Sequence, residues 1–125
     1  MSEGEITGAE PAAQAGHLTV ATTTTDGIRI LTLSGEIDHH TGDTLRQALD
    51  TPDTPRPRFV ADMQQVTFMD SSGINILIHA HNTLSEAGGW LRLADTSESV
   101  MRTLSLVGID TLIDCRETLH QALST

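Results

Sequence analysis

The residues of this sequence best suited to chemistry lie between Phe68 and Ile74, in the run Phe-Met-Asp-Ser-Ser-Gly-Ile. The run joins a short apolar strand to an amphipathic helix, so an acid, two hydroxyls and a glycine fall at a helix start. Backbone N–H groups are free there and the helix dipole is positive, so such a position accommodates a phosphate. The pattern indicates a covalent switch. The alternative is plain helix capping.

The elements that would position this run follow from hydrophobic periodicity and turn residues. Residues 1–16 have almost no sizeable apolar residue and predict a disordered tail before one domain over 17–125. Asp26-Gly27 predicts a hairpin turn. Strands are predicted over 17–23, 28–34, 59–63 and 90–94 and within 109–113, and about four helices over 41–50, 71–87, 96–108 and 116–123. This alternation predicts a mixed, mostly parallel α/β sheet that begins with an antiparallel hairpin.

Composition narrows the classes of partner. The formal net charge of −10 over 125 residues disfavours nucleic acid and anionic membrane, and a basic protein partner would suit it better. Acidity that only keeps the chain soluble is the plainer alternative. Cys115 is the only cysteine, so no internal disulfide is possible and a reducing compartment is indicated. With no secretory signal or apolar run long enough to span a bilayer, we expect a cytoplasmic protein.

Three segments resemble the bacterial anti-sigma factor antagonists, the stand-alone members of the STAS domain family that they share with sulfate transporters. The first is the 68–74 run. The second is 33–41, which contains Gly35-Glu36-Ile37-Asp38, and the third is 104–109, which contains Val107-Gly108. Their order and spacing are similar to the family's, and the resemblance covers residues 17–123. It implies a single STAS-type domain.

The resemblance also implies a function and a set of site residues. The unphosphorylated protein would bind an anti-sigma factor and so release a sigma factor. That anti-sigma factor would itself be a serine kinase of the histidine-kinase-like ATPase superfamily, and phosphorylation of Ser71 would end binding. A PP2C-type, metal-dependent serine phosphatase would reset the switch. The residues expected to bind the partner are Asp38, His39, Asp70, Ser72, Gly73 and Asn75.

Several of these residues have a second interpretation. Ser72 is an alternative acceptor, or its hydroxyl caps the helix or supports the loop. Gly73 leaves room for a partner's backbone or a nucleotide, or simply allows a tight helix entry. Asp38 contacts the kinase or is a solubilising surface charge, and His39 contacts a partner or is a solvated turn residue. Asn75 departs from the family, which has a small residue there, and is expected to face outward.

Other functional classes find less support in the sequence. We find no Gly-x-Ser-x-Gly elbow, no phosphate-binding Gly-Lys loop and no metal-ligand spacing. We therefore expect no enzymatic activity, no cofactor and no metal. The main alternative function is a STAS adaptor subunit of an ABC-type lipid or anion transport system, which would use the same helix without phosphorylation. A nucleotide- or lipid-sensing module is a third class.

Overall fold

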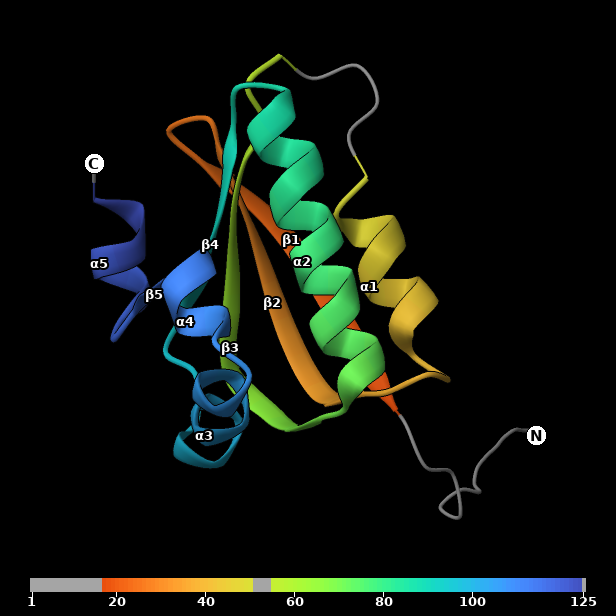
Figure 1. Ribbon diagram of the computed structural model, residues 1–125. Helices are drawn as coiled ribbons and strands as arrows, with labels where there is room; N and C mark the ends of the chain where they lie inside the picture. The colour runs from red at the N-terminus through yellow and green to blue at the C-terminus, as the bar shows by residue number, and fades with distance from the viewer. Residues whose placement is uncertain (1–16, 51–54, 125) are drawn as a thin grey trace, which may run out of the picture.

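A computed structural model describes residues 17–50 and 55–124 of the chain. In these residues five strands form one sheet in the order β1-β2-β3-β4-β5, and five helices pack on it (Figure 1). The predicted tail over 1–16 and residues 51–54 of the proline-rich connection lie outside the described residues.

The sheet opens with the predicted hairpin. β1 (Leu18–Thr25) pairs antiparallel with β2 (Ile28–Ile37), and both turn residues between them, Asp26 and Gly27, have positive φ. The remaining strands, β3 (Arg58–Met69), β4 (Trp90–Ala94) and β5 (Asp114–Arg116), pair parallel from β2 outward. The predicted mixed, mostly parallel sheet is therefore confirmed.

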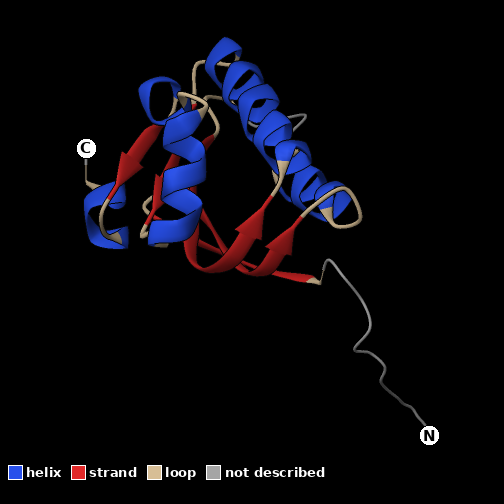
Figure 2. Cartoon of the chain, turned by 60° about the horizontal axis from the view of Figure 1, so that its bottom comes forward, coloured by secondary structure: helices blue, strands red, loops and turns tan. Residues whose placement is uncertain are grey.

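The helices are α1 (Gly42–Ala48), α2 (Ser71–Glu86), α3 (Glu98–Leu106), α4 (Ile109–Leu112) and α5 (Leu119–Leu123). The long α2 lies across one face of the sheet with α1 beside it (Figures 1 and 2). Successive side chains of β3 point to opposite faces of the sheet. Phe59 and Ala61 belong to the main core with Leu77 of α2, whereas Val60 packs in a smaller cluster with Ala122 of α5.

β3 is longer than its sequence predicted. A strand was expected to end at Met63, because Gln64 and Gln65 break the apolar run, but pairing with β2 continues to Met69. The register between β2 and β3 shifts twice. Thr32 pairs with Asp62 but Ser34 pairs with Gln65, and Gly35 pairs with Val66 but Glu36 pairs with Phe68. Each shift places one extra residue in β3, and such bulges re-aim the side chains that follow.

The end of the chain also differs from expectation. Residues 109–112 form the helix α4, where a strand was predicted, and the last strand starts only at Asp114. Gly108, at φ 82, ends α3 and turns the chain directly into α4. The described residues thus contain five helices rather than about four. Cys115 is half-buried in β5, where burial raises the pKa of its thiol to about 11.

Candidate phosphorylation and partner-binding site

The site begins where β3 passes into α2, and Asp70 organises that junction. Asp70 has an extended backbone and is the N-cap of α2. Its carboxylate accepts hydrogen bonds from the backbone N–H of Ser72 at 2.8 Å and of Gly73 at 3.4 Å. The helix is therefore capped by Asp70 rather than by the Ser72 hydroxyl. The N–H groups of Ser72 and Gly73, expected to be free, are already bound.

The next residues differ in how far they reach the surface. Ser71 is the first residue of α2 and is exposed, whereas Ser72 is half-buried. Asn75, one turn later, is exposed, as expected if Ile74 and Leu77 face the core. Gly73 is buried, and a β-carbon on it would lie 2.6 Å from Ile37 Cγ2 and 2.8 Å from Met69 Cγ. The missing side chain of Gly73 thus gives room to the chain's own strands.

The second part of the site is the turn between β2 and α1. Asp38 is only 7% exposed. Its carboxylate accepts hydrogen bonds from the N–H groups of His40 at 2.8 Å and Thr41 at 3.1 Å. The Thr41 hydroxyl donates to the Glu36 carbonyl at 2.9 Å instead of capping α1, although Thr41 occupies the N-cap position. Asp38 therefore holds the turn together from within.

The hydrogen bonds around Asp38 also set its ionisation. Burial raises the pKa of this carboxyl, but the backbone N–H groups of Thr41 and His40, the nearby His40 ring and the Thr41 hydroxyl together lower it below its ordinary value of 3.8. A carboxylate that accepts backbone hydrogen bonds is favoured in its charged form. Asp38 is thus a fixed negative charge beneath the turn.

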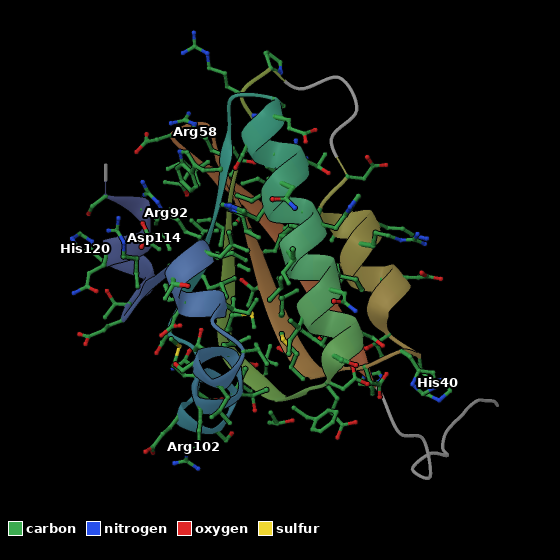
Figure 3. All side chains as sticks on the ribbon, viewed as in Figure 1. His40, Arg58, Arg92, Arg102, Asp114 and His120 are labelled. Carbon is green, nitrogen blue, oxygen red and sulfur yellow. The ribbon has the colours of Figure 1, made fainter. Side chains whose placement is uncertain are left out.

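The two parts of the site are joined by the sheet. The Asp70 N–H donates to the Ile37 carbonyl at 3.1 Å, so the end of β2 lies beside the start of α2. His39 and Ser72 line the same shallow depression of about 250 Å³, together with Arg46 of α1. The His39 and His40 rings lie 4.0 Å apart and are exposed, and Figure 3 shows His40 beside the start of α1.

Two features of this region were not found from the sequence. A groove of about 560 Å³ runs between α1 and α2 and is lined by side chains of both, among them Arg46, Ile76 and His79. Phe68, just before the switch, is an exposed aromatic residue. The groove depends on how two helices pack, and the exposure of Phe68 depends on how far α5 covers the second face of β3, so neither leaves a local sequence signal.

Comparisons with known proteins agree with this architecture. The family model described as "STAS domain" matches residues 19–122. An anti-sigma F factor antagonist from Paenibacillus polymyxa is 33% identical over 85 residues, which cover 66% of this chain and 73% of that protein. The crystal structure of an anti-sigma factor antagonist from Mycobacterium paratuberculosis superposes with a TM-score of 0.77 at 29% identity, covering 86% of this chain and 92% of that one.

A third likeness comes from a transporter protein. The structure of a sulfate transporter family protein from Wolinella succinogenes gives a TM-score of 0.70 at 22% identity, covering 81% of this chain and 85% of that one, and shows the shared fold. The chain belongs to the STAS domain family, and the resemblance on which this expectation rested is confirmed. In the described residues no helix is long and apolar enough to cross a membrane.

Proposed function

We propose that this chain is an anti-sigma factor antagonist whose binding is switched by phosphorylation of Ser71. Unphosphorylated, it binds an anti-sigma factor in the cytoplasm and so frees a sigma factor. The anti-sigma factor is also the serine kinase, of the histidine-kinase-like ATPase superfamily, and a PP2C-type phosphatase reverses the modification. The names of the relatives support the antagonist role in general. The chain acts as a substrate and a binding protein and has no catalytic role of its own.

The observation that carries the proposal is the exposed Ser71 hydroxyl on the first residue of a helix that Asp70 already caps. In the transfer, the Ser71 oxygen bonds to the γ-phosphorus of ATP, ADP leaves, and the hydroxyl proton passes to a base of the kinase. Hydrolysis by the phosphatase restores the hydroxyl and releases inorganic phosphate. Because the cap and the core under Gly73 do not involve the Ser71 side chain, the surface changes while its support stays in place.

The partner surface that we propose follows from exposure. Ser71, His39 and Asn75 are exposed and face the anti-sigma factor, and Ser72 lies at the edge of that contact. Asp38, Asp70 and Gly73 act from beneath it, because their polar or backbone atoms hold the two turns in shape. Phosphate on Ser71 adds about −1.5 to −2 charges and considerable bulk to this surface. A tenfold loss of affinity requires only about 1.4 kcal/mol.

The acceptor is tested by incubating the chain with its purified cognate anti-sigma factor and ATP and mapping the phosphopeptide. We expect one phosphate, on Ser71. Ser71→Ala should abolish labelling but keep its affinity for the anti-sigma factor, since only an exposed hydroxyl is lost. The matched control, Ser72→Ala, should be labelled normally. Phosphate found on Ser72 alone, or undiminished labelling of Ser71→Ala, would refute the assignment.

The switch itself is tested by calorimetric titration of the same anti-sigma factor. We expect Ser71→Asp to bind more weakly than Ser71→Ala and the phosphorylated chain to bind more weakly still. Arg58→Ala is a control at the opposite end of the molecule, where Arg58 bonds the Asp26 carbonyl, and it should bind like the wild type (Figure 3). If authentic phosphorylation leaves the affinity unchanged, the switch is absent. The adaptor role in an ABC-type transport system would then be favoured.

A further inference from the structure

The surface next to the switch carries an apolar residue that the fold does not need there. The whole chain has two Phe, one Trp and no Tyr. Phe59 is 1% exposed in the main core, and Trp90 is half-buried against the Arg92 guanidinium at 3.9 Å. Phe68 alone among them is exposed, with 48% of its surface open. A sequence so poor in aromatic residues places one of its three at the surface.

Phe68 lies on the face of β3 that points away from the main core. Val66 and Met69 are buried in that core, whereas Thr67 and Phe68 between them are exposed. Each of the two register shifts adds one residue to β3, so together they restore the alternation that starts at Phe59, and Phe68 faces away from the core with or without them. The smaller cluster that α5 builds on this other face includes Val60 but no later residue of β3. Among the described residues, Phe68 is therefore left uncovered at the end of the strand.

Phe68 also lies within reach of the switch, with polar residues around it. Its α-carbon is at most about 11 Å from that of Ser71, because three peptide units separate them. Glu36 is its cross-strand partner on β2, and Thr67 and Gln65 are exposed next to it on β3. An exposed apolar centre within a polar rim is the usual anatomy of a binding hot spot.

We propose that Phe68 is the apolar anchor of the contact with the anti-sigma factor and enters an apolar pocket on that partner; this rests on the function proposed above. In the described residues the other large exposed apolar side chains are Leu106, Val107 and Leu112, on or next to α3 and α4. Phe68 is the one among them that adjoins Ser71. Its rim is acidic at Glu36 and Asp70, so the pocket should be bordered by basic residues.

The chain's own N-terminal segment is the competing occupant. The described chain begins at this end of the sheet, since the His17 carbonyl accepts a hydrogen bond from the Glu36 N–H at 2.9 Å. Residues 1–16, however, contain three Glu, no Lys or Arg, and only Met1 and Ile6 as sizeable apolar residues. Acidic residues are poorly matched to a rim that already holds Glu36 and Asp70. Charge therefore favours a separate, basic partner over this segment.

An anchor at Phe68 gives the phosphate a second way to end binding. The pocket around Phe68 must exclude water when the complex forms, whereas a phosphoryl group on Ser71 retains its hydration strongly. With no more than about 11 Å between the two α-carbons, a partner that covers Phe68 lies over or beside Ser71, so a hydrated phosphate there opposes closure of the apolar contact. The anchor and the phosphate should therefore be energetically coupled.

The test compares affinities of full-length variants for the purified cognate anti-sigma factor. Phe68→Ala should weaken binding about thirtyfold, the fold-change that corresponds to about 2 kcal/mol, and the loss should persist at high salt because the contact is apolar. Phe68→Leu should recover most of the affinity. Leu106→Ala removes a side chain that is 82% exposed on α3 and is the matched control, with unchanged affinity expected. Ser71→Asp should cost less affinity in the Phe68→Ala background than alone.

Melting temperatures separate the remaining outcomes. Phe68→Ala should melt within a few degrees of the wild type, since an exposed side chain is removed. A large fall in melting temperature with unchanged affinity would mean that the chain itself covers Phe68, and it would overturn the proposal. Equal affinities of wild type and Phe68→Ala would do the same while leaving the proposed function intact. If the wild type does not bind, the proposed function fails first.

Discussion

At the scale of single residues, two aspartates next to the switch use their carboxylates in the same way. Asp38 accepts hydrogen bonds from the N–H groups of His40 and Thr41, and Asp70 accepts them from those of Ser72 and Gly73. Each acid closes a turn at the end of a parallel strand, where backbone donors lack partners. Acidic residues that a sequence presents as surface charges are therefore, at this edge, part of the scaffold.

The role of Asp38 predicts a characteristic pH dependence. Because hydrogen bonds lower its pKa below 3.8 in the folded chain, the charged carboxylate stabilises the fold at and above neutral pH. That stabilisation falls as the pH drops below 3.8 and disappears below the folded-state pKa. Asp38→Asn should thus unfold at lower denaturant concentration than the wild type at pH 7, and the difference should shrink as the pH approaches 3.

Urea unfolding at a series of pH values measures this difference. Asp43→Asn makes the same chemical change on an exposed residue of α1, whose carboxylate pairs with Arg46 on the surface. It should alter the free energy of unfolding by no more than about 0.5 kcal/mol. A deficit of Asp38→Asn that stays constant, or grows, in acid would show that the carboxylate does not act through its charge.

At the scale of elements, Arg92 fastens the short helix α5 to the sheet. From β4 its guanidinium donates to the carbonyls of Ala122 and Ser124, both at 2.9 Å, and it lies 3.6 Å from the Asp114 carboxylate of β5. Trp90 stacks on it. A helix of five residues cannot be stable alone, so its place depends on such contacts and on burial of Ala122.

Removing this guanidinium should release α5. We expect Arg92→Ala to lower the free energy of unfolding by about 1.5–3 kcal/mol, as charged hydrogen bonds are lost, and to speed amide exchange in α5. The control is Arg102→Ala, because the Arg102 side chain is 69% exposed against 15% for Arg92 and pairs with Glu98 on the surface of α3; Figure 3 shows both arginines. Its effect should not exceed about 0.5 kcal/mol. Equal effects would contradict the fastening role.

The elements also show where prediction from sequence succeeds and where it stops. The hairpin at Asp26-Gly27 and the long α2 follow from local turn chemistry and sustained periodicity, and both are confirmed. The predicted end of β3 was wrong because two bulges, which pairing with β2 fixes, interrupt the alternation of buried and exposed residues after Met63. The strand predicted within 109–113 was wrong because the four residues of α4 are too few for periodicity to separate strand from helix.

The same limit applies to the candidate site. The acid and hydroxyls at a helix start were identifiable from local sequence, as was the outward direction of Asn75. The inward turn of the Asp38 carboxylate was missed, although the N–H groups that it binds belong to His40 and Thr41, only two and three residues later. The exposure of Phe68 was missed too, because it depends on α5 covering this face of β3 only near Val60. Contacts made across the fold decide what a locally recognisable residue does.

At the scale of the whole molecule, the site lies at one end of an acidic domain with its support built into the sheet. The ends of β2 and β3 are joined by the hydrogen bond from Asp70 to Ile37, and the core continues beneath Gly73. Phosphorylation changes a formal net charge of −10 by about two more units. Whether the fold tolerates that change depends on opposing local interactions at the start of α2.

We expect phosphorylation of Ser71 to leave the domain almost as stable as before. The helix dipole favours the phosphate by about 0.3–1 kcal/mol. Repulsion from Asp70 opposes it by about 1 kcal/mol if the charges lie about 6 Å apart in water. Since Asp70 already holds the N–H groups of Ser72 and Gly73, the phosphate should point into solvent and leave the cap in place. The melting temperature should change by no more than about 5 °C.

Asp70→Asn provides the matched control for this balance, because its amide oxygen can still cap the helix while the repulsion is removed. In that background phosphorylation should raise the melting temperature, since only the favourable dipole interaction remains. Circular dichroism of both proteins, with and without phosphate, should show the same helical signal. A fall of more than about 10 °C in the wild type with loss of that signal would mean that the start of α2 unfolds. The switch would then act by local unfolding, and charge and bulk at an intact surface would not explain release.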